Sequence, residues 1–340
     1  MPHPPALKAS LKRGAFVAAA NWPLIAVQFI AEGTEQLLLA VPVVGGIALV
    51  VLLLGADIEE VMSGDMKESI PNVIGALRAH PVALGFFGAS FLVVLFGASV
   101  LTFIVKGGTV SVLATAEAQA GPIERPPLRL AALRRANLTN IEPFLDGCRR
   151  FWRRYVKLGF CLLIVYAATG GVVLAFVVGG YGLLGNVGAL LGWTFAALPA
   201  LSALVVWITL VNFLYLLIQM AIAVEDVGVR DGMRRVGQFI RASLREVAGI
   251  FGIVLLLVAI TTVASILATA GLGLIAVIPF IGLAMVPLQL GAWLLRGIVF
   301  EYLALTALGA YLTQYRYYLH SLEAVRVPDT ATDVTGPHLA

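Results

Sequence analysis

The residues from Gly159 to Val224 form a run of 66 positions without an Asp, Glu, Lys, Arg or His. No element of a soluble core is both that long and that apolar. The hydrocarbon core of a bilayer is about 30 Å thick and is crossed by roughly 20 helical residues. The run therefore predicts two membrane crossings and the short turn between them.

The composition of the whole chain is typical of a membrane protein. Of its 340 residues, 60% are hydrophobic and only 12% are charged, and the mean hydropathy is +0.96. We therefore expect one transmembrane helical domain over residues 1–320 and a flexible tail over 321–340. The two cysteines, Cys148 and Cys161, lack the spacing of a disulfide or metal site and are expected to be ordinary thiols.

Uncharged runs of sufficient length predict about six transmembrane helices arranged as hairpins, an all-α polytopic fold. The last run, Leu274–Tyr315, has about 40 residues, too many for one straight crossing at 1.5 Å per residue. Because Pro279 and Pro287 interrupt it, we expect a kinked helix with an interfacial part, or alternatively a re-entrant half-helix before a shorter crossing. The other crossings are expected near Gln36–Leu54, Val82–Val105, Gly159–Gly179, Gly192–Val224 and Val247–Ala270.

The beginning of the chain contains a further apolar run, which is divided by polar residues. Within Ala15–Leu54, Pro23 and the pair Glu32 and Glu35 separate two apolar parts. Basic residues precede this run, as they do in a signal peptide, but no clean small-residue cleavage site follows. We therefore expect a retained interfacial or membrane segment.

Basic residues are distributed unevenly among the connecting segments. Ten lie in Lys106–Lys157 and five in Glu225–Glu246, whereas Asp57–His80 has two against five acids, and the turns Tyr181–Gly188 and Gly271–Gly273 have no charge. Lys and Arg near crossings accumulate on the cytoplasmic side. We therefore expect both termini and both basic segments in the cytoplasm. High Ala, Gly, Val and Leu content with more Arg than Lys indicates a GC-rich bacterial genome. Because the chain is helical, we expect it in the bacterial cytoplasmic (inner) membrane.

Two of the basic segments repeat a short motif at an offset of 85 residues. Asp146–Arg150 reads DGCRR, Asp231–Arg235 reads DGMRR, and a crossing follows each. In both copies apolar residues at helical spacing form a stripe, with arginines beside or opposite it. Helices of this kind lie in the membrane interface, with their apolar side at the acyl boundary and their cations at anionic headgroups. The stripes are Phe144, Cys148, Phe151, Trp152 and Tyr155 in the first copy and Val229, Met233, Val236, Ile240 and Leu244 in the second.

From these basic amphipathic helices we expect membrane lipids, and anionic lipids in particular, to be the main partners. A membrane-protein partner or a homo-oligomer is a further possibility, and no nucleic acid is expected. Alternatively, the charge only fixes the topology. With a weaker third copy at Leu7–Arg13, the repeat units lie near 5–105, 143–224 and 228–318. The candidate lipid- or partner-binding residues are Arg149, Arg150, Arg153, Arg154, Lys157, Arg230, Arg234, Arg235, Arg241 and Arg245.

Several short segments resemble a broad prokaryotic group of six-helix membrane proteins, which includes the membrane domain of membrane-anchored glycerophosphodiester phosphodiesterases and uncharacterised relatives. They are Ala221–Arg235, Leu11–Gly14, Asn21–Pro23 and Tyr315–Tyr318. The resemblance would cover most of the chain, and its motifs are short. It implies helical hairpins with interfacial helices. The catalysis of the phosphodiesterases cannot be carried over, because this sequence contains no soluble phosphodiesterase domain.

Catalytic and metal-binding patterns are missing from the sequence. It has no Gly-rich phosphate loop, no His-Glu-x-x-His motif, no Gly-x-Ser-x-Gly motif and no cluster of His or Cys. The four histidines are scattered along the chain. We therefore expect a protein that is not an enzyme, with no cofactor and no metal site.

Ionisable residues inside the last apolar run form the other candidate site. An Arg in a membrane helix costs about 2.5–3.5 kcal/mol on insertion scales, so Arg296 and Glu301 should face protein, water or an interface. Together with Gln289 they form a possible intramembrane polar site. The alternative is that Arg296 extends to the interface or braces neighbouring helices.

These observations lead to one functional expectation and one alternative. The first is a non-enzymatic inner-membrane protein with an accessory, scaffold or lipid-organising role, exerted through its basic interfacial helices. The alternative is a small transporter or channel with a polar site at the Pro-interrupted last run. Broken helices near the midplane favour this alternative, and the scarcity of charge in the membrane disfavours it.

Overall fold

The computed structural model describes residues 6–54, 75, 79–125, 130–138, 141–181, 187–276 and 281–326, and all regular structure in these residues is helical. Six of the helices are long and apolar enough to cross a membrane. The predicted all-α polytopic membrane fold is therefore confirmed. The expected tail at 321–340 differs in part, because the last helix continues to Arg326; the remainder of the tail lies outside the described residues.

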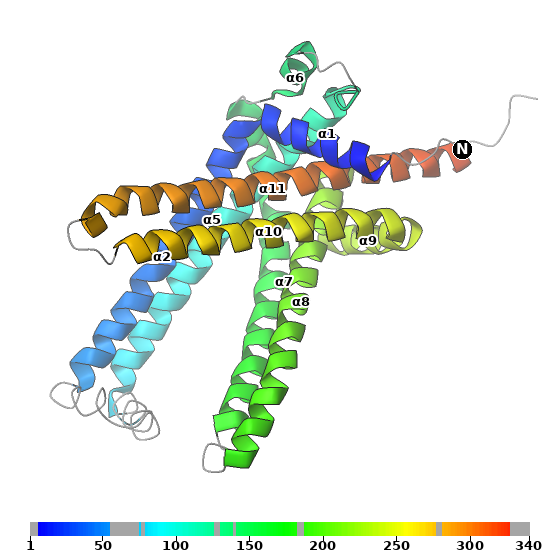
Figure 1. Ribbon diagram of the computed structural model, residues 1–340. Coiled ribbons are helices and arrows are strands. Elements are labelled where there is room, and N and C mark those ends of the chain that lie inside the picture. The colour runs from blue at the N-terminus through cyan, green and yellow to red at the C-terminus, as the bar shows by residue number, and fades with distance from the viewer. Residues whose placement is uncertain are drawn as a thin grey trace, which may run out of the picture.

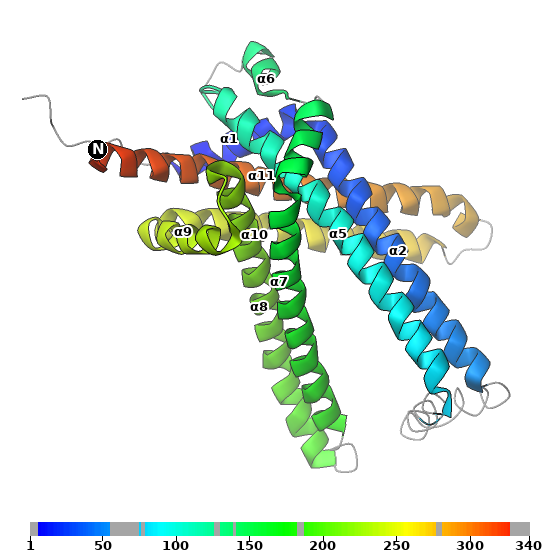
Figure 2. The ribbon, with the colours of Figure 1, turned by 180° about the vertical axis from the view of Figure 1, so that it is seen from behind.

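The six long helices form three antiparallel hairpins that meet at one end and diverge towards their tips, like the legs of a tripod (Figures 1 and 2). We call the region where they meet the junction. The hairpins are α2 (Trp22–Leu54) with α5 (Pro81–Gln119), α7 (Ile141–Tyr181) with α8 (Val187–Glu225), and α10 (Leu244–Ala276) with α11 (Ile281–Arg326).

Three shorter helices surround the junction: α1 (Leu7–Ala20), α6 (Leu130–Ala136) and α9 (Val229–Ala242). Asn21 separates α1 from α2 and links them to α6. Its Nδ2 donates hydrogen bonds to the carbonyl oxygens of Val17 (2.9 Å) and Ala136 (2.7 Å), and its Oδ1 accepts one from the backbone N–H of Leu138 (2.9 Å). These hydrogen bonds fix α1 and α6 to the same end of the bundle.

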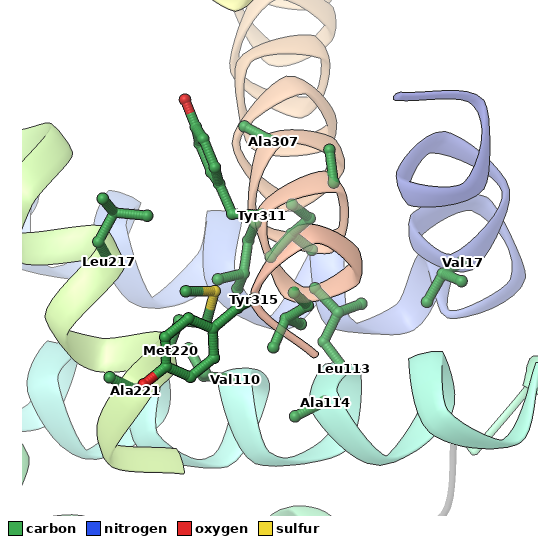
Figure 3. Packing of buried hydrophobic residues seen from close by; sticks show 14 of the residues in the cluster. Val17, Val110, Leu113, Ala114, Leu217, Met220, Ala221, Ala307, Tyr311 and Tyr315 are labelled. Atoms are coloured by element: carbon green, nitrogen blue, oxygen red, sulfur yellow. The ribbon is translucent and has the colours of Figure 1, made fainter. Parts of the chain in front are cut away.

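The buried core also lies at the junction. Val17 of α1, Leu113 of α5, Met220 of α8 and Tyr315 of α11 converge there, and all four are fully buried (Figure 3). Along the legs of the tripod, by contrast, large apolar side chains are exposed; Leu52, for example, is 78% exposed. Such a surface is suited to contact with lipid, because lipid acyl chains are as apolar as the exposed side chains.

The first amphipathic segment is not a separate interfacial helix, which differs from the prediction. Residues 144–157 are the opening turns of α7, which continues without interruption into the membrane-spanning part. No residue near Lys157 breaks the backbone hydrogen bonds, and Phe151 and Tyr155 of the apolar stripe are buried in the core. The second amphipathic segment, α9, does form a helix of its own that ends before Ser243.

The long helices extend beyond the predicted crossings, because a helix does not end where its apolar run ends. Gly271 and Gly273 lie inside α10 and not in a turn. The connection to α11 falls at residues 277–280, which include Pro279 and lie outside the described residues. From Ile281 onward the last run is one helix that contains Pro287. Because Leu274 belongs to α10, the single kinked helix expected over Leu274–Tyr315 is wrong: the run is divided between two helices.

The first and last helices touch backbone to backbone. A Cβ placed on Gly14 would lie 2.4 Å from the carbonyl oxygen of Thr306, and one placed on Gly309 would lie 2.8 Å from Cα of Gly14. Real Cβ atoms do not approach other atoms this closely, so α1 and α11 can cross here only because both positions are glycine. The Tyr302 hydroxyl also donates to the carbonyl oxygen of Ala15 at 3.3 Å.

Gly14→Ala should therefore destabilise the junction. Overpacking of this kind costs about 1–3 kcal/mol, so the midpoint of thermal unfolding in detergent should fall. Gly33→Ala is the matched control, since Gly33 also lies in a helix and its Cβ would meet nothing within 4 Å. Equal unfolding midpoints for the two variants would contradict the close crossing.

Candidate functional site

A cavity of about 400 Å³ lies where the three hairpins meet. Its lining comes from α2, α5, α8, α10 and α11, so every hairpin contributes to it. Most of the lining is apolar or aromatic, and a few polar groups converge on it, which is the usual composition of a small-molecule site. The ionisable carboxyl and amino groups in the lining are Glu32, Lys106 and Glu301.

Glu32 and Lys106 form an ion pair across the first hairpin, with 3.0 Å between Lys106 Nζ and Glu32 Oε1. Both side chains are mostly shielded, being 32% and 25% exposed. One helical turn further along α2, the Glu35 carboxylate accepts hydrogen bonds from Thr102 Oγ1 (2.6 Å) and Ser99 Oγ (3.4 Å). The two glutamates of α2 are thus both bound to α5, which explains how an apolar helix pair tolerates them.

Glu301 projects from α11 towards this ion pair. Its side chain is buried, and it interacts electrostatically with both Glu32 and Lys106. Its Oε2 atom has no hydrogen-bond partner among the described residues. Glu301, whose insertion into a membrane is energetically costly, is therefore shielded from lipid inside the cavity.

A smaller cavity of about 320 Å³ adjoins the first and shares Glu32, Phe300 and Glu301 with it. Arg296 lines this smaller cavity, and its guanidinium lies 5.6 Å from the centre of the Phe300 ring. The structure thus brings Arg296 and Glu301 to one cavity, although they lie five positions apart on the same helix. Gln289 lines neither cavity.

Lys106 and Glu32 were not among the candidate site residues predicted from the sequence. Lys106 directly follows the apolar run Val82–Val105, so it was assigned to the basic cytoplasmic segment. In the structure α5 continues to Gln119, which places Lys106 inside a long helix. The sequence feature that could have predicted this site is the pair Glu32 and Glu35 within an apolar run, because acidic residues in a membrane require partners.

The ten basic residues predicted to bind lipid or a partner lie around the junction on α7, α9 and the start of α10. Three of them form ion pairs within the protein. Arg150 Nη2 lies 2.7 Å from Asp226 Oδ2, Arg154 also pairs with Asp226, and Arg235 pairs with Glu225. Hydrogen bonds from the two arginines lower the pKa of Asp226, so this carboxylate stays ionised at neutral pH.

The acidic pair at the end of α8 therefore connects the two copies of the basic motif. Asp226 adopts a left-handed backbone conformation, with φ of 54°, at the turn between α8 and α9. Glu225 also accepts a hydrogen bond from the Tyr315 hydroxyl of α11. This turn therefore engages three of the predicted arginines in ion pairs within the protein, although the side chains of Arg150 and Arg235 stay 63% and 46% exposed.

The other seven predicted cations form no ion pair with any described residue, and their side chains are exposed. Arg153 packs over the ring of Trp152, with 5.3 Å between its guanidinium carbon and the ring centre. In α9, Val236 and Phe239 are buried, so this helix presents its cationic side outward. The seven residues are Arg149, Arg153, Lys157, Arg230, Arg234, Arg241 and Arg245.

No group of three or more His, Cys, Asp or Glu side chains in the described part of the chain is arranged to hold a metal ion. Comparison of the chain with protein-family models, with curated proteins and with solved structures finds no match. The resemblance to the membrane domain of glycerophosphodiester phosphodiesterases therefore stays a prediction.

Lys106→Met should destabilise the protein, because it leaves two carboxyl groups facing each other in the cavity without a cation. Breaking a fully buried ion pair costs about 3–5 kcal/mol; since this pair is partly exposed, we expect about 2–3 kcal/mol. Adding Glu32→Gln should restore much of that loss. The free energy of unfolding in detergent measures both effects, and a double variant no more stable than Lys106→Met would contradict the pairing.

Proposed function

We propose that the protein is a non-enzymatic integral protein of a bacterial inner membrane that organises anionic lipid, or holds a partner complex, through the basic surface around its junction. The observation that carries this proposal is the exposure of seven cationic side chains at the one end of the bundle where the hairpins meet. This end of the bundle and both termini are proposed to lie in the cytoplasm, in agreement with the positive-inside bias of the sequence.

The basic surface has the form expected for contact with headgroups. The buried side of α9 anchors it to the core, and its arginines Arg230, Arg234 and Arg241 point outward. Lipid-exposed apolar side chains begin on the adjoining legs of the bundle, so these cations lie near the level of the lipid phosphates. Each basic residue near an anionic surface contributes about 1 kcal/mol to the attraction.

The variant with Arg230→Gln, Arg234→Gln, Arg241→Gln and Arg245→Gln should retain anionic lipid at least about tenfold less well than the wild type, since four such contributions are lost. Native mass spectrometry of protein extracted from vesicles of phosphatidylglycerol and phosphatidylcholine measures the retained lipid. A membrane-protein partner or a second copy held by the same surface would be lost together with the lipid.

Arg150→Gln with Arg154→Gln is the control, because these arginines pair with Asp226 inside the protein. It should lower the unfolding midpoint and leave lipid retention largely unchanged. If the four-residue variant retains lipid and all co-purifying proteins as the wild type does, the proposed role is wrong.

A small transporter or channel is the second candidate, and the ionisable cavity within the membrane favours it. In proteoliposomes loaded with a pH-sensitive dye, a potassium diffusion potential would drive protons through any pathway that uses Glu301. Glu301→Gln should abolish that flux, and Glu35→Gln should not, because Glu35 lies outside the cavity lining. Wild-type liposomes no more permeable than empty ones would exclude a proton pathway.

A further inference from the structure

The larger cavity contains more acidic than basic side chains. Glu32 and Lys106 form an ion pair, and Glu301, which contacts Glu32, is a second acid that shares this one lysine in the described lining. Arg296 lies at the smaller cavity, where it is exposed and packs on Phe300. A ligand that compensates Glu301 would therefore carry a positive charge.

Polar atoms without hydrogen-bond partners are concentrated in this cavity. Glu301 Oε2 and the Tyr311 hydroxyl are buried and, among the described residues, without a partner, and the Tyr215 hydroxyl and the Gln219 side chain, which interact with each other, lie beside them. All four residues are more than nine-tenths buried, and all four line the cavity. An unsatisfied buried polar group is costly in a protein and more so in a bilayer, so their convergence indicates a site built to bind something.

The remaining wall of the cavity is aromatic. The Phe213 ring centre lies 4.9 Å from that of Phe251 and 5.5 Å from that of Tyr311, and Tyr311 reaches from α11 into the space beside α8 (Figure 3). Aromatic faces attract organic cations. A bare metal ion would instead require a compact shell of several oxygen ligands, which a cavity of about 400 Å³ with this lining does not offer.

We infer that this cavity binds a protonated amine attached to an apolar body. The ammonium group donates hydrogen bonds to Glu301 Oε2, and the apolar body lies against Phe213 and Phe251. The same chemistry is present in a free organic amine and in the ammonium of an aminophospholipid headgroup. The inference rests on the cavity alone and requires neither lipid binding at the basic surface nor transport.

Binding of 2-phenylethylammonium chloride to the protein in phosphatidylcholine nanodiscs tests the inference. 2-Phenylethanol is the matched neutral probe, and sodium chloride at equal concentration controls for ionic strength. Isothermal titration should show binding of the amine by wild-type protein. Glu301→Gln should weaken it at least about tenfold, because a charge-assisted hydrogen bond is lost, and Glu35→Gln should leave it unchanged.

A second arm distinguishes the two sources of the ammonium group. Thermal unfolding is compared in nanodiscs of phosphatidylethanolamine and of phosphatidylcholine, whose quaternary ammonium has no N–H to donate. A stabilisation in phosphatidylethanolamine that disappears in Glu301→Gln identifies a headgroup ligand. Binding of the soluble amine without any effect of the lipid identifies a free amine.

Tyr311→Phe provides a test if Glu301→Gln does not fold, since it removes one unpartnered hydroxyl and keeps the aromatic wall. It should weaken amine binding about three- to tenfold, as expected for a lost hydrogen bond. The inference is overturned if neither the amine nor phosphatidylethanolamine has an effect, if phenylethanol or sodium chloride acts equally well, or if both variants bind as the wild type does.

Discussion

The buried carboxylate of Glu117 holds the junction together, because arginines from the first and the last helix bind it from two sides. Arg13 Nε lies 2.8 Å from its Oε1, and Arg316 Nε lies 2.9 Å from its Oε2. Arg13 also reaches Glu124 at 3.0 Å, and Arg316 donates to the carbonyl oxygen of Ala114 at 2.7 Å. Two helices that are far apart in the sequence, α1 and α11, are thereby fixed to one charge in α5. Such a network is stable only when complete, since losing one member leaves the others buried and uncompensated.

The clamp at Glu117 also positions the cavity. Lys106 lies three turns before Glu117 on α5, and Glu301 lies about four turns before Arg316 on α11, so both project into the bundle at a similar distance, roughly 16–23 Å, from the clamp. The close contact of Gly14 with Gly309 also holds α1 against α11 near this clamp. Beyond the cavity the hairpins diverge and expose apolar side chains. The packed core of the molecule is therefore confined to one end, and Glu32, Lys106 and Glu301 lie where the helices are still packed together.

The membrane fold could be predicted from the sequence because the length of an uncharged run is a local property. Glu301 could be marked for the same reason: an ionisable group within such a run is costly wherever its partners lie. The partners themselves could not be predicted. Lys106 binds Glu32, and Arg13 binds a residue 104 positions away, and neither pairing leaves a mark in the local pattern. The basic motifs were recognised as a repeat, yet nothing local showed that Asp226 would pair with Arg150 and Arg154.

The packing of α1 on α11 has a consequence for how the chain is made. The Gln314 side chain donates to the Ser10 hydroxyl, a contact that spans 304 positions, and synthesis of that length takes about 15–60 s at 5–20 residues per second. During this interval the ribosome has not yet produced the surface that buries Gly14, nor the second arginine that binds Glu117. The first helix emerges with its packing partner still unmade and has to wait at the membrane for it. The junction can therefore be completed only after α11 has been synthesised, and a nascent chain that stops before α11 lacks one of the helices that join at Glu117.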